Sequence, residues 1–171
     1  MDQQFRDLMA AVCAPVAIVT TADEAGPHGA TVSSLASVSL RPPLISIALD
    51  RRSKLLARLL AAGRFGVNVL GCSQDELATL FASREVDRFT QTRWSMADGL
   101  PRIEGCAGWA ACELHQTIPA GDHLLLIGQV RIAASWPHPT LVYGHRTFGT
   151  HSEFRQRPSR PVIDTIAACA R

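Results

Sequence analysis

The sequence predicts a mainly β fold, a closed or nearly closed antiparallel barrel with a few accessory helices. Three observations support this prediction. Segments with the alternation or β-branched composition of strands outnumber those with helical spacing. The strand-like segments do not alternate regularly with helices, as they would in a parallel sheet. The 171 residues also show no internal repeat and fit the usual size of one domain.

The N-terminal elements are a short helix and a hairpin. Apolar residues at i, i+3, i+4 and i+7 within residues 5–12 predict an apolar helical stripe, and Pro15 ends that helix. The β-branched run at residues 16–21 predicts a strand. Residues 23–29 contain Gly and Pro and predict a turn, so the chain is expected to reverse into the next strand.

The stretch from residue 28 to residue 54 is the most distinctive part of the chain. In residues 31–40 the even positions are mostly apolar and the odd positions mostly carry hydroxyls. This pattern predicts one strand with a face that can pack and a face that offers hydroxyls. The Arg-Pro-Pro at residues 41–43 must interrupt a sheet, and residues 44–49 resume as a strand.

Two helices and a strand follow this stretch. Ser53 is a good N-cap for a helix that stops before Gly63. Residues 64–70 alternate and predict a half-buried strand. Residues 73–76 form a capping-box pattern that opens a helix over residues 77–81.

The C-terminal half contains the strongest strand signal. Residues 82–105 lose periodicity and predict a loop that is long enough to be functional. Residues 106–115 and 123–132 predict strands joined by a turn at residues 119–122, and residues 141–148 predict a last short strand.

The tail after the last strand differs in composition from the rest of the chain. Residues 153–171 are rich in Arg and Pro and predict an extended arm or one that packs on a partner subunit, with a short helix at residues 162–169. Residues 1–152 are therefore expected to form the one folded domain.

Composition excludes several classes of function. A net charge of +2 with 19% charged residues provides neither a basic field for nucleic acid nor an acidic tail. The five cysteines are scattered and form no C-x-x-C pair, which predicts reduced thiols and no zinc knuckle. No apolar run approaches the ~20 residues of a membrane span, and the polar N-terminus does not resemble a signal peptide. A cytoplasmic protein without a membrane partner is expected.

Several catalytic motifs are missing from the sequence. It contains no G-x-G-x-x-G after a strand, no P-loop, no H-E-x-x-H and no G-x-S-x-G. His138, His145 and His151 share no metal-ligand spacing, so no metal site is assigned.

Three segments could bind a ligand, and each also has an ordinary structural explanation. Residues 50–54 place three cations and a hydroxyl at a helix start, which suits a phosphate but equally suits a capped helix with solvated charges. Residues 31–34 could offer donors to a heterocycle rich in hydrogen-bond acceptors or form a strand with one solvent-exposed face. His123, after Gly121 and Asp122, could orient a second ligand or form a local turn hydrogen bond.

Five blocks, taken in order, resemble a known family. They are GATVSSLASVSLRPPLISIALDRRSKL, RFGVNVL, QDELATLFASREVDRF, GDHLLLIGQV and LVYGHRTFG. Together they cover much of residues 5–150 and resemble the flavin reductase-like family, the reductase components of two-component flavin monooxygenases. The resemblance implies an FMN-binding Greek-key split barrel that pairs as a homodimer and binds FMN, or in some members FAD.

The resemblance also implies roles for individual residues. The segment lining the isoalloxazine and ribityl matches Thr31, Val32, Ser33, Ser34, Leu35, Ser37 and Val38. The phosphate-side loop matches Asp50, Arg51, Arg52, Ser53 and Lys54, and a second flavin-contacting region matches Phe81, Ala82, Ser83 and Arg88. The nicotinamide side matches His123, the catalytic positioning candidate, and Tyr143. Position 35 is often aromatic in relatives, so stacking there is expected to differ.

The implied activity is NAD(P)H-dependent flavin reduction. NADH or NADPH would pass a hydride to FMN or FAD, and alignment of the two rings would be most of the catalysis. The reduced flavin would then supply a partner monooxygenase. Two alternatives remain: a flavin-binding electron carrier that does not oxidise NAD(P)H, and a non-enzymatic dimeric interaction protein on the same scaffold.

Overall fold

The computed structural model describes residues 1–83 and 87–151, and the prediction of a mainly β fold is confirmed over these ranges. The elements follow one another as α1 (Asp2–Ala11), β1 (Ala14–Pro15), β2 (Ala17–Asp23), β3 (Gly26–Val32), β4 (Ala36–Leu40), β5 (Pro43–Asp50), α2 (Lys54–Ala62), β6 (Arg64–Val69), α3 (Asp75–Ala82), β7 (Trp94–Ala97), β8 (Leu100–Ile103), β9 (Gly108–Ala120), β10 (His123–Ser135), β11 (Leu141–Gly144) and β12 (Thr147–Thr150). The predicted arm at residues 153–171 and its helix at residues 162–169 lie outside the described residues. None of the helices in the described ranges is long and apolar enough to cross a membrane.

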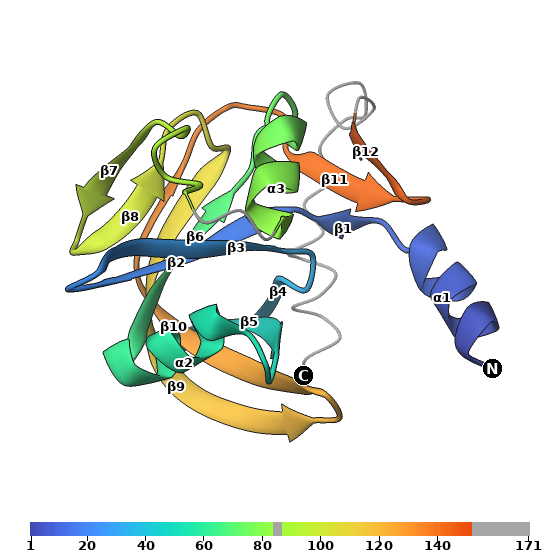
Figure 1. Cartoon of the computed structure of the whole chain (residues 1–171), viewed down its shortest axis with the longest axis horizontal. Coiled ribbons are helices and arrows are strands. Elements are labelled where there is room, and N and C mark those ends of the chain that lie inside the picture. Colours follow the sequence, from blue (N-terminus) through green and yellow to red (C-terminus); the bar gives the residue numbers. More distant parts are fainter. Residues whose placement is uncertain (84–86, 152–171) are drawn as a thin grey trace.

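Seven strands form one antiparallel sheet in the order β3-β2-β6-β9-β10-β5-β4 (Figure 1). Its two edge strands, β3 and β4, are consecutive in the chain and are joined by residues 33–35 alone. In a flat sheet the edges would be about 29 Å apart, whereas this connection reaches at most about 14 Å. The sheet therefore curls until its edges approach each other near residues 33–35.

The prediction of one strand over residues 31–40 is wrong, because β3 ends at Val32 and β4 begins only at Ala36. Between them the Ser34 hydroxyl accepts a hydrogen bond from the Ala48 backbone N–H (2.9 Å) and contacts the Ala48 carbonyl oxygen (3.2 Å). This side chain satisfies the β5 backbone where an uninterrupted strand would otherwise pair.

The packing face predicted for residues 31–40 is confirmed at the buried Val32 but is wrong in β4. Val38 is 51% exposed and Leu40 is 82% exposed. Both lie on β4, which is an edge of the sheet. An apolar edge strand of this kind is a surface on which a partner can pair.

The hairpin of β2 and β3 is confirmed, although its turn is shorter than predicted. The strands pair antiparallel down to Asp23 and Gly26, so the predicted turn at residues 23–29 is mostly strand. Gly26 has a φ of 110°, a conformation that favours glycine, and the Asp23 carboxylate accepts a hydrogen bond from the Ala25 N–H (2.9 Å).

The first two predicted helices are confirmed. In α1 no residue is buried, and its apolar stripe is exposed, with Phe5 61% and Leu8 64% accessible. In α2 Ser53 is the N-cap residue, but its side chain makes no capping hydrogen bond. Gly63, with a φ of 65°, ends α2 at the predicted place.

The helix α3 is confirmed, but the predicted capping box at residues 73–76 is wrong. The N-cap is Gln74, and its side chain makes no capping hydrogen bond. The Gln74 amide instead accepts from the Gly71 N–H (2.8 Å) and donates to the Glu104 carbonyl (2.8 Å). This amide ties the start of α3 to the segment after β8.

Two predicted segments contain hairpins that periodicity did not indicate. The predicted loop at residues 82–105 includes the paired strands β7 and β8. The predicted strand at residues 141–148 is β11 and β12, which turn at His145 and Arg146, both with positive φ. With β1, these two strands form a separate three-stranded sheet.

The core includes both faces of β6, so the prediction of a half-buried strand is wrong. Phe65 and Asn68 have no exposed surface, and Val67 is 2% exposed. The Asn68 side-chain oxygen accepts a hydrogen bond from the Ile103 N–H (2.8 Å), and its amide donates to the Ile18 carbonyl (3.1 Å). A buried polar side chain with such partners fixes how β2, β6 and β8 fit together.

The hairpin of β9 and β10 is confirmed, with both strands longer than predicted. Gly121, with a φ of 60°, and Asp122 form its turn. On its other side β10 pairs with β5, so that His123 lies opposite Asp50. The tip of this hairpin therefore lies beside the basic loop that precedes α2.

Candidate functional site

A large cavity lies over β3, between the start of α2 and the end of α3, the two helices that flank β3 in Figure 1. Its volume is about 1270 Å³, compared with roughly 300–1,000 Å³ for most small-molecule sites. Its walls come from residues 27–31 of β3, residues 52–55 and Arg58 at α2, residues 81–83 at α3, residues 87–90 and Trp94.

The basic loop before α2 is held in shape by Asp50. Its carboxylate accepts hydrogen bonds from the Arg52 backbone N–H (2.7 Å), Nε (3.2 Å) and Nη2 (2.9 Å). These bonds lower the pKa of Asp50 to about 2. The loop is also tied to the β9–β10 turn, because the Arg51 N–H donates to the Asp122 carbonyl (3.0 Å).

The first turn of α2 brings a cation, a hydroxyl and backbone N–H groups to the cavity wall. Lys54 is exposed, lines the cavity and forms no ion pair with any described residue. Ser53 also lines the cavity, and its hydroxyl is not used as a cap. The first backbone N–H groups of a helix have no partner within the helix and favour anions. These groups together suit a phosphate.

The hydroxyl-rich segment is partly used in holding the fold. The Thr31 hydroxyl donates to the Ala78 carbonyl (2.7 Å), which ties β3 to α3 at the cavity wall. Ser34 contacts Ala48 as described above. Val32 is 7% exposed and belongs to the core. Ser33 is exposed, and its side chain makes no hydrogen bond with another described residue.

The opposite wall is aromatic and is closed by Arg88. The Arg88 guanidinium donates to the Gly29 carbonyl (2.8 Å) and to the Ser83 carbonyl, which joins the segment after α3 to β3. Phe89 packs edge-on against the buried Phe81 (5.1 Å between ring centres) and against Trp94 (5.5 Å). Phe89 and Trp94 give this side of the cavity an apolar surface.

The structure brings together about half of the residues expected to bind a flavin. Those that line the cavity are Thr31, Arg52, Ser53, Lys54, Phe81, Ala82, Ser83 and Arg88. Those that do not line it are Val32, Ser33, Ser34, Leu35, Ser37, Val38, Asp50 and Arg51.

The two residues expected on the nicotinamide side lie in different sheets. His123 does not line the cavity; its Nδ1 lies 2.7 Å from an Asp122 carboxylate oxygen, and its backbone is paired opposite Asp50. Tyr143 is on β11, paired with Ala14 in the three-stranded sheet, and also lies outside the cavity lining.

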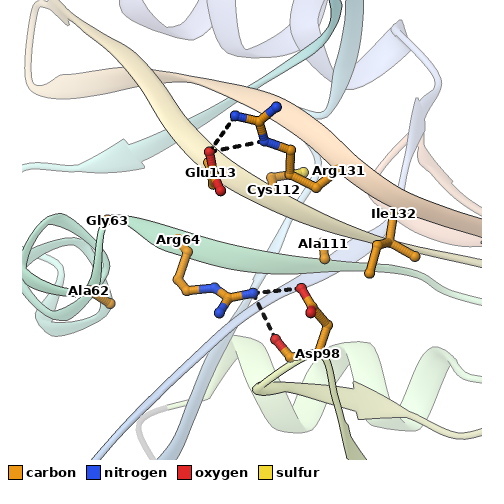
Figure 2. A pocket seen from close by; sticks show the side chains of 9 residues that line it. All are labelled: Ala62, Gly63, Arg64, Asp98, Ala111, Cys112, Glu113, Arg131 and Ile132. Atoms are coloured by element: carbon orange, nitrogen blue, oxygen red, sulfur yellow. Dashed lines mark hydrogen bonds and ion pairs between the residues drawn. The ribbon is translucent and has the colours of Figure 1, made fainter.

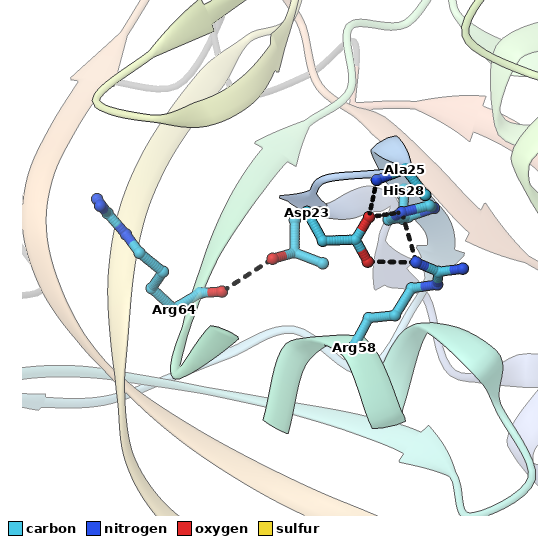
Figure 3. Close-up of polar contacts among 6 residues, drawn as sticks. Asp23, Ala25, His28, Arg58 and Arg64 are labelled. Atoms are coloured by element: carbon cyan, nitrogen blue, oxygen red, sulfur yellow. Dashed lines mark hydrogen bonds and ion pairs between the residues drawn. The ribbon is translucent and has the colours of Figure 1, made fainter. Parts of the chain in front are cut away.

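Sequence reasoning missed a cluster of Asp23, His28 and Arg58, two of which line the cavity (Figure 3). The Asp23 carboxylate lies 2.8 Å from His28 Nε2 and pairs with Arg58 Nη1, which is itself 2.8 Å from His28 Nε2. The hydrogen bond with His28 is the main cause that lowers the pKa of Asp23 to about 2. Only the position of Arg58, four residues after Lys54 on one helix face, could have indicated it.

A second hollow of about 650 Å³ lies beside the end of α2 and strands β6, β9 and β10 (Figure 2). Its charged side chains are paired with one another: Arg64 with Asp98 (2.6 Å) and Arg131 with Glu113 (2.6 Å). None of the expected site residues lines it. The paired charges leave no excess charge to attract an ionic ligand.

The described cysteines are free thiols without a metal-binding arrangement. Burial raises the pKa of Cys106 and of Cys112 to about 12, so both stay protonated at neutral pH. Cys13 and Cys72 are exposed. In the part of the chain that the structure describes, no group of three His, Cys, Asp or Glu residues could hold a metal ion. Cys169 lies outside the described residues.

Comparison with known proteins gives a consistent result over most of the chain. A family model described as "Flavin reductase like domain" matches residues 9–152. The "Flavin reductase (NADPH)" of Lentzea aerocolonigenes is 37% identical over 147 residues, which are 84% of this chain and 86% of that protein. The "Flavin-dependent trigonelline monooxygenase, reductase component" of Acinetobacter baylyi is 35% identical over 130 residues, 75% of this chain but only 42% of that protein.

Solved structures agree with these relatives. The NADH:FAD oxidoreductase SgcE6 of Streptomyces globisporus C-1027 superposes with a TM-score of 0.83 at 30% identity, covering 88% of this chain and 93% of that one. This structural match therefore covers most of the chain, as the sequence matches do.

Proposed function

The chain belongs to the flavin reductase-like family, and from this premise we propose that it transfers a hydride from NADH or NADPH to a flavin. The observation that carries the proposal is the cavity over β3. Lys54, which forms no ion pair with a described residue, lines this cavity together with the rest of the first turn of α2 and with Thr31, Phe81 and Arg88. These are segments that family membership associates with flavin binding.

The residues around the cavity fit a phosphorylated flavin. Lys54, Ser53 and the backbone N–H groups of α2 suit its phosphate. The aromatic side chains of Phe89 and Trp94 suit a planar ring system and keep water from that wall. When bound, the flavin supplies the hydride-accepting chemistry, as cofactors do in such enzymes. FMN and FAD both satisfy these requirements.

The protein's own contribution is then to position the reactants. Asp50 fixes the loop that presents Ser53 and Lys54, and Arg88 fixes the wall on the other side. Holding two reactants in a reactive geometry accounts for much of the rate of a hydride transfer. No covalent nucleophile or general base is required, in agreement with the protonated state of the buried thiols.

We propose that the active form is a homodimer. His123 and Tyr143, both expected on the nicotinamide side, lie outside the cavity of their own chain. The exposed apolar residues Val38 and Leu40 on β4 and the stripe of α1 give a second copy a surface to cover. In a dimer, a residue from one chain could complete the cavity of the other. The curled sheet also supports the Greek-key split barrel expected for the family.

Reduced flavin is proposed to serve a partner monooxygenase. Relatives whose names describe them as reductase components support this, among them the trigonelline monooxygenase reductase component of Acinetobacter baylyi. The chain belongs with such components by family, so its product would be the reduced flavin that an oxygenase consumes.

Mixing the purified protein with FMN or FAD and with NADH or NADPH, and following absorbance at 340 nm, tests the proposal. A reductase consumes the nucleotide in a flavin-dependent way. Flavin that binds without nucleotide oxidation would indicate an electron carrier instead. Protein that takes up no flavin would indicate a non-enzymatic interaction protein. Size-exclusion chromatography with light scattering tests the homodimer.

A further inference from the structure

The cluster of Asp23, His28 and Arg58 joins three elements beside the cavity (Figure 3). Asp23 ends β2, His28 lies on β3, and Arg58 lies one turn into α2. His28 Nε2 is 2.8 Å from both the Asp23 carboxylate and Arg58 Nη1. The side chains are partly buried, with 21% of His28 and 38% of Arg58 exposed. Such mutual contacts hold the His28 and Arg58 side chains in fixed positions.

Two of the three residues in this cluster contribute to the cavity wall. His28 and Arg58 line it, whereas Asp23 does not. Asp23 therefore orients the two side chains from outside the cavity. Its contacts use Nε2 of His28 and Nη1 of Arg58, and Nδ1 of His28 and Nε and Nη2 of Arg58 make no hydrogen bond with another described residue. Up to three nitrogen atoms remain free to bind an anion.

The position of Arg58 relative to Lys54 suggests the kind of anion. Residues four apart on a helix are neighbours on one face, about 6 Å apart. The side of the cavity formed by α2 thus offers two positions for an anion, one after the other along the helix. Lys54 forms the first, and Arg58 together with His28 forms the second. A flavin mononucleotide has one phosphate and needs only the first. A flavin dinucleotide has two linked phosphates and matches both.

The rest of the cavity has room for the remainder of a dinucleotide. Its volume of about 1270 Å³ exceeds what a small ligand fills. Phe89 and Trp94 line it as well and pack edge-on against each other. Their apolar surface suits one of the two planar ring systems of a flavin dinucleotide, and the remaining volume takes the other.

We infer that Arg58 and His28, oriented by Asp23, form a second phosphate subsite that makes FAD the preferred flavin over FMN. The adenosine-bearing phosphate of FAD binds there, while the flavin-bearing phosphate binds at Ser53 and Lys54. This inference rests on the proposed function, because it divides the same cavity into two subsites. Arg58 is a specificity-determining residue and takes no part in the hydride transfer.

Flavin binding without NAD(P)H tests this directly. FMN and FAD are each titrated into flavin-free protein, and the dissociation constants are measured from quenching of flavin fluorescence. FAD is expected to bind about tenfold more tightly than FMN, the difference of one additional charge-assisted contact. Arg58→Ala is expected to remove most of that difference by weakening FAD while changing FMN less than about twofold.

Two further variants separate this subsite from a general structural effect. Arg131→Ala is the matched control, because Arg131 also forms an exposed ion pair, with Glu113, but lies at the other hollow; it should change neither affinity. Arg58→Lys keeps the charge and is expected to retain part of the FAD preference. This variant keeps the test valid if Arg58→Ala fails to fold.

Three results would overturn the inference. One is equal affinity of the wild-type protein for FMN and FAD. Another is an equal loss of both affinities in Arg58→Ala. The third is an unchanged FAD affinity with a raised KM for NADPH, which would assign the subsite to the 2′-phosphate of the nucleotide. Absence of any flavin binding would instead refute the proposed function, so the two failures are distinguishable.

Discussion

Lys54 offers the most direct test of the phosphate site, because it is the only lysine in the sequence. It begins α2, lines the cavity and forms no ion pair with a described residue. Replacing it with alanine removes one cation and leaves the helix start and the Asp50–Arg52 contacts in place. Alanine is also a good helix former, so α2 is expected to persist.

The expected effect follows from the environment of Lys54. A charge-assisted hydrogen bond contributes about 1.5–3 kcal/mol, and a phosphate at a helix start gains about 0.3–1 kcal/mol from the backbone. Lys54 is exposed, so solvent screening lowers its share, and Lys54→Ala is expected to weaken FMN binding by about 1–2 kcal/mol, or about 5–30-fold. Riboflavin has no phosphate, so its affinity should change less than about twofold.

Titration of FMN and riboflavin into both proteins gives the four dissociation constants. The ratio of the two affinities should fall in Lys54→Ala and should fall less in ~0.5 M salt, which screens exposed charges. An amine-specific reagent, with the labelled peptide identified by mass spectrometry, should modify Lys54 more slowly when FMN is present. Equal weakening of both ligands would refute the phosphate contact, as would labelling that FMN does not slow.

Three predictions concern the scaffold and its pH dependence. Gly128→Ala should lower the free energy of unfolding by about 1–3 kcal/mol in urea titrations, because a Cβ there would lie 2.4 Å from the buried Phe65 ring. Asn68→Ala should cost about 2 kcal/mol in the same assay, since it leaves the buried Ile103 N–H without its acceptor. Asp50, with a pKa lowered to about 2 from its usual 3.8, stabilises the fold fully above pH about 4 and loses this contribution as the pH falls through 2. The stability difference between wild-type and Asp50→Asn should therefore be smaller at pH 3 than at pH 6; an equal difference would contradict this.

The sequence pattern correctly predicted the elements that are determined by interactions between residues close in sequence. The spacing of leucines after Ser53 and the glycine at position 63 give α2 its bounds. The Gly121–Asp122 turn gives the longest hairpin. In each case the deciding interactions lie within a few residues, so the sequence alone contains enough information.

Two of the incorrect predictions depend on residues that are distant in sequence. The break after Val32 is stabilised by Ser34 and Ala48, which are 14 positions apart. The capping box is replaced because Gln74 bonds to Glu104, 30 positions away. Periodicity carries no information about such partners, and it described β6 as half-buried because it could not show that both faces are covered.

The candidate site was predicted only in part for the same reason, since a sequence pattern does not reveal contacts between residues that are distant in sequence. The family resemblance indicated residues for the ring, the phosphate and a second contact region, and half of these residues line one cavity. Asp23, His28 and Arg58 belong to no motif, because the Arg58 contact joins positions 35 apart in sequence. They are brought together only when α2 packs beside the β2–β3 hairpin.

His123 lies where the curled sheet brings the β9–β10 turn beside the basic loop before α2, two regions that are far apart in sequence. Pairing of β10 with β5 sets His123 opposite Asp50, and the neighbouring Asp122 carbonyl accepts a hydrogen bond from Arg51. A change at His123 therefore acts first on the loop that presents Ser53 and Lys54 within the same chain. If such a change alters flavin affinity, the contact between Asp122 and Arg51 accounts for it. If it alters only the KM for NAD(P)H, His123 would have to reach a nicotinamide in the cavity of a second copy, because it does not line the cavity of its own chain. The proposed homodimer would be an arrangement compatible with both effects.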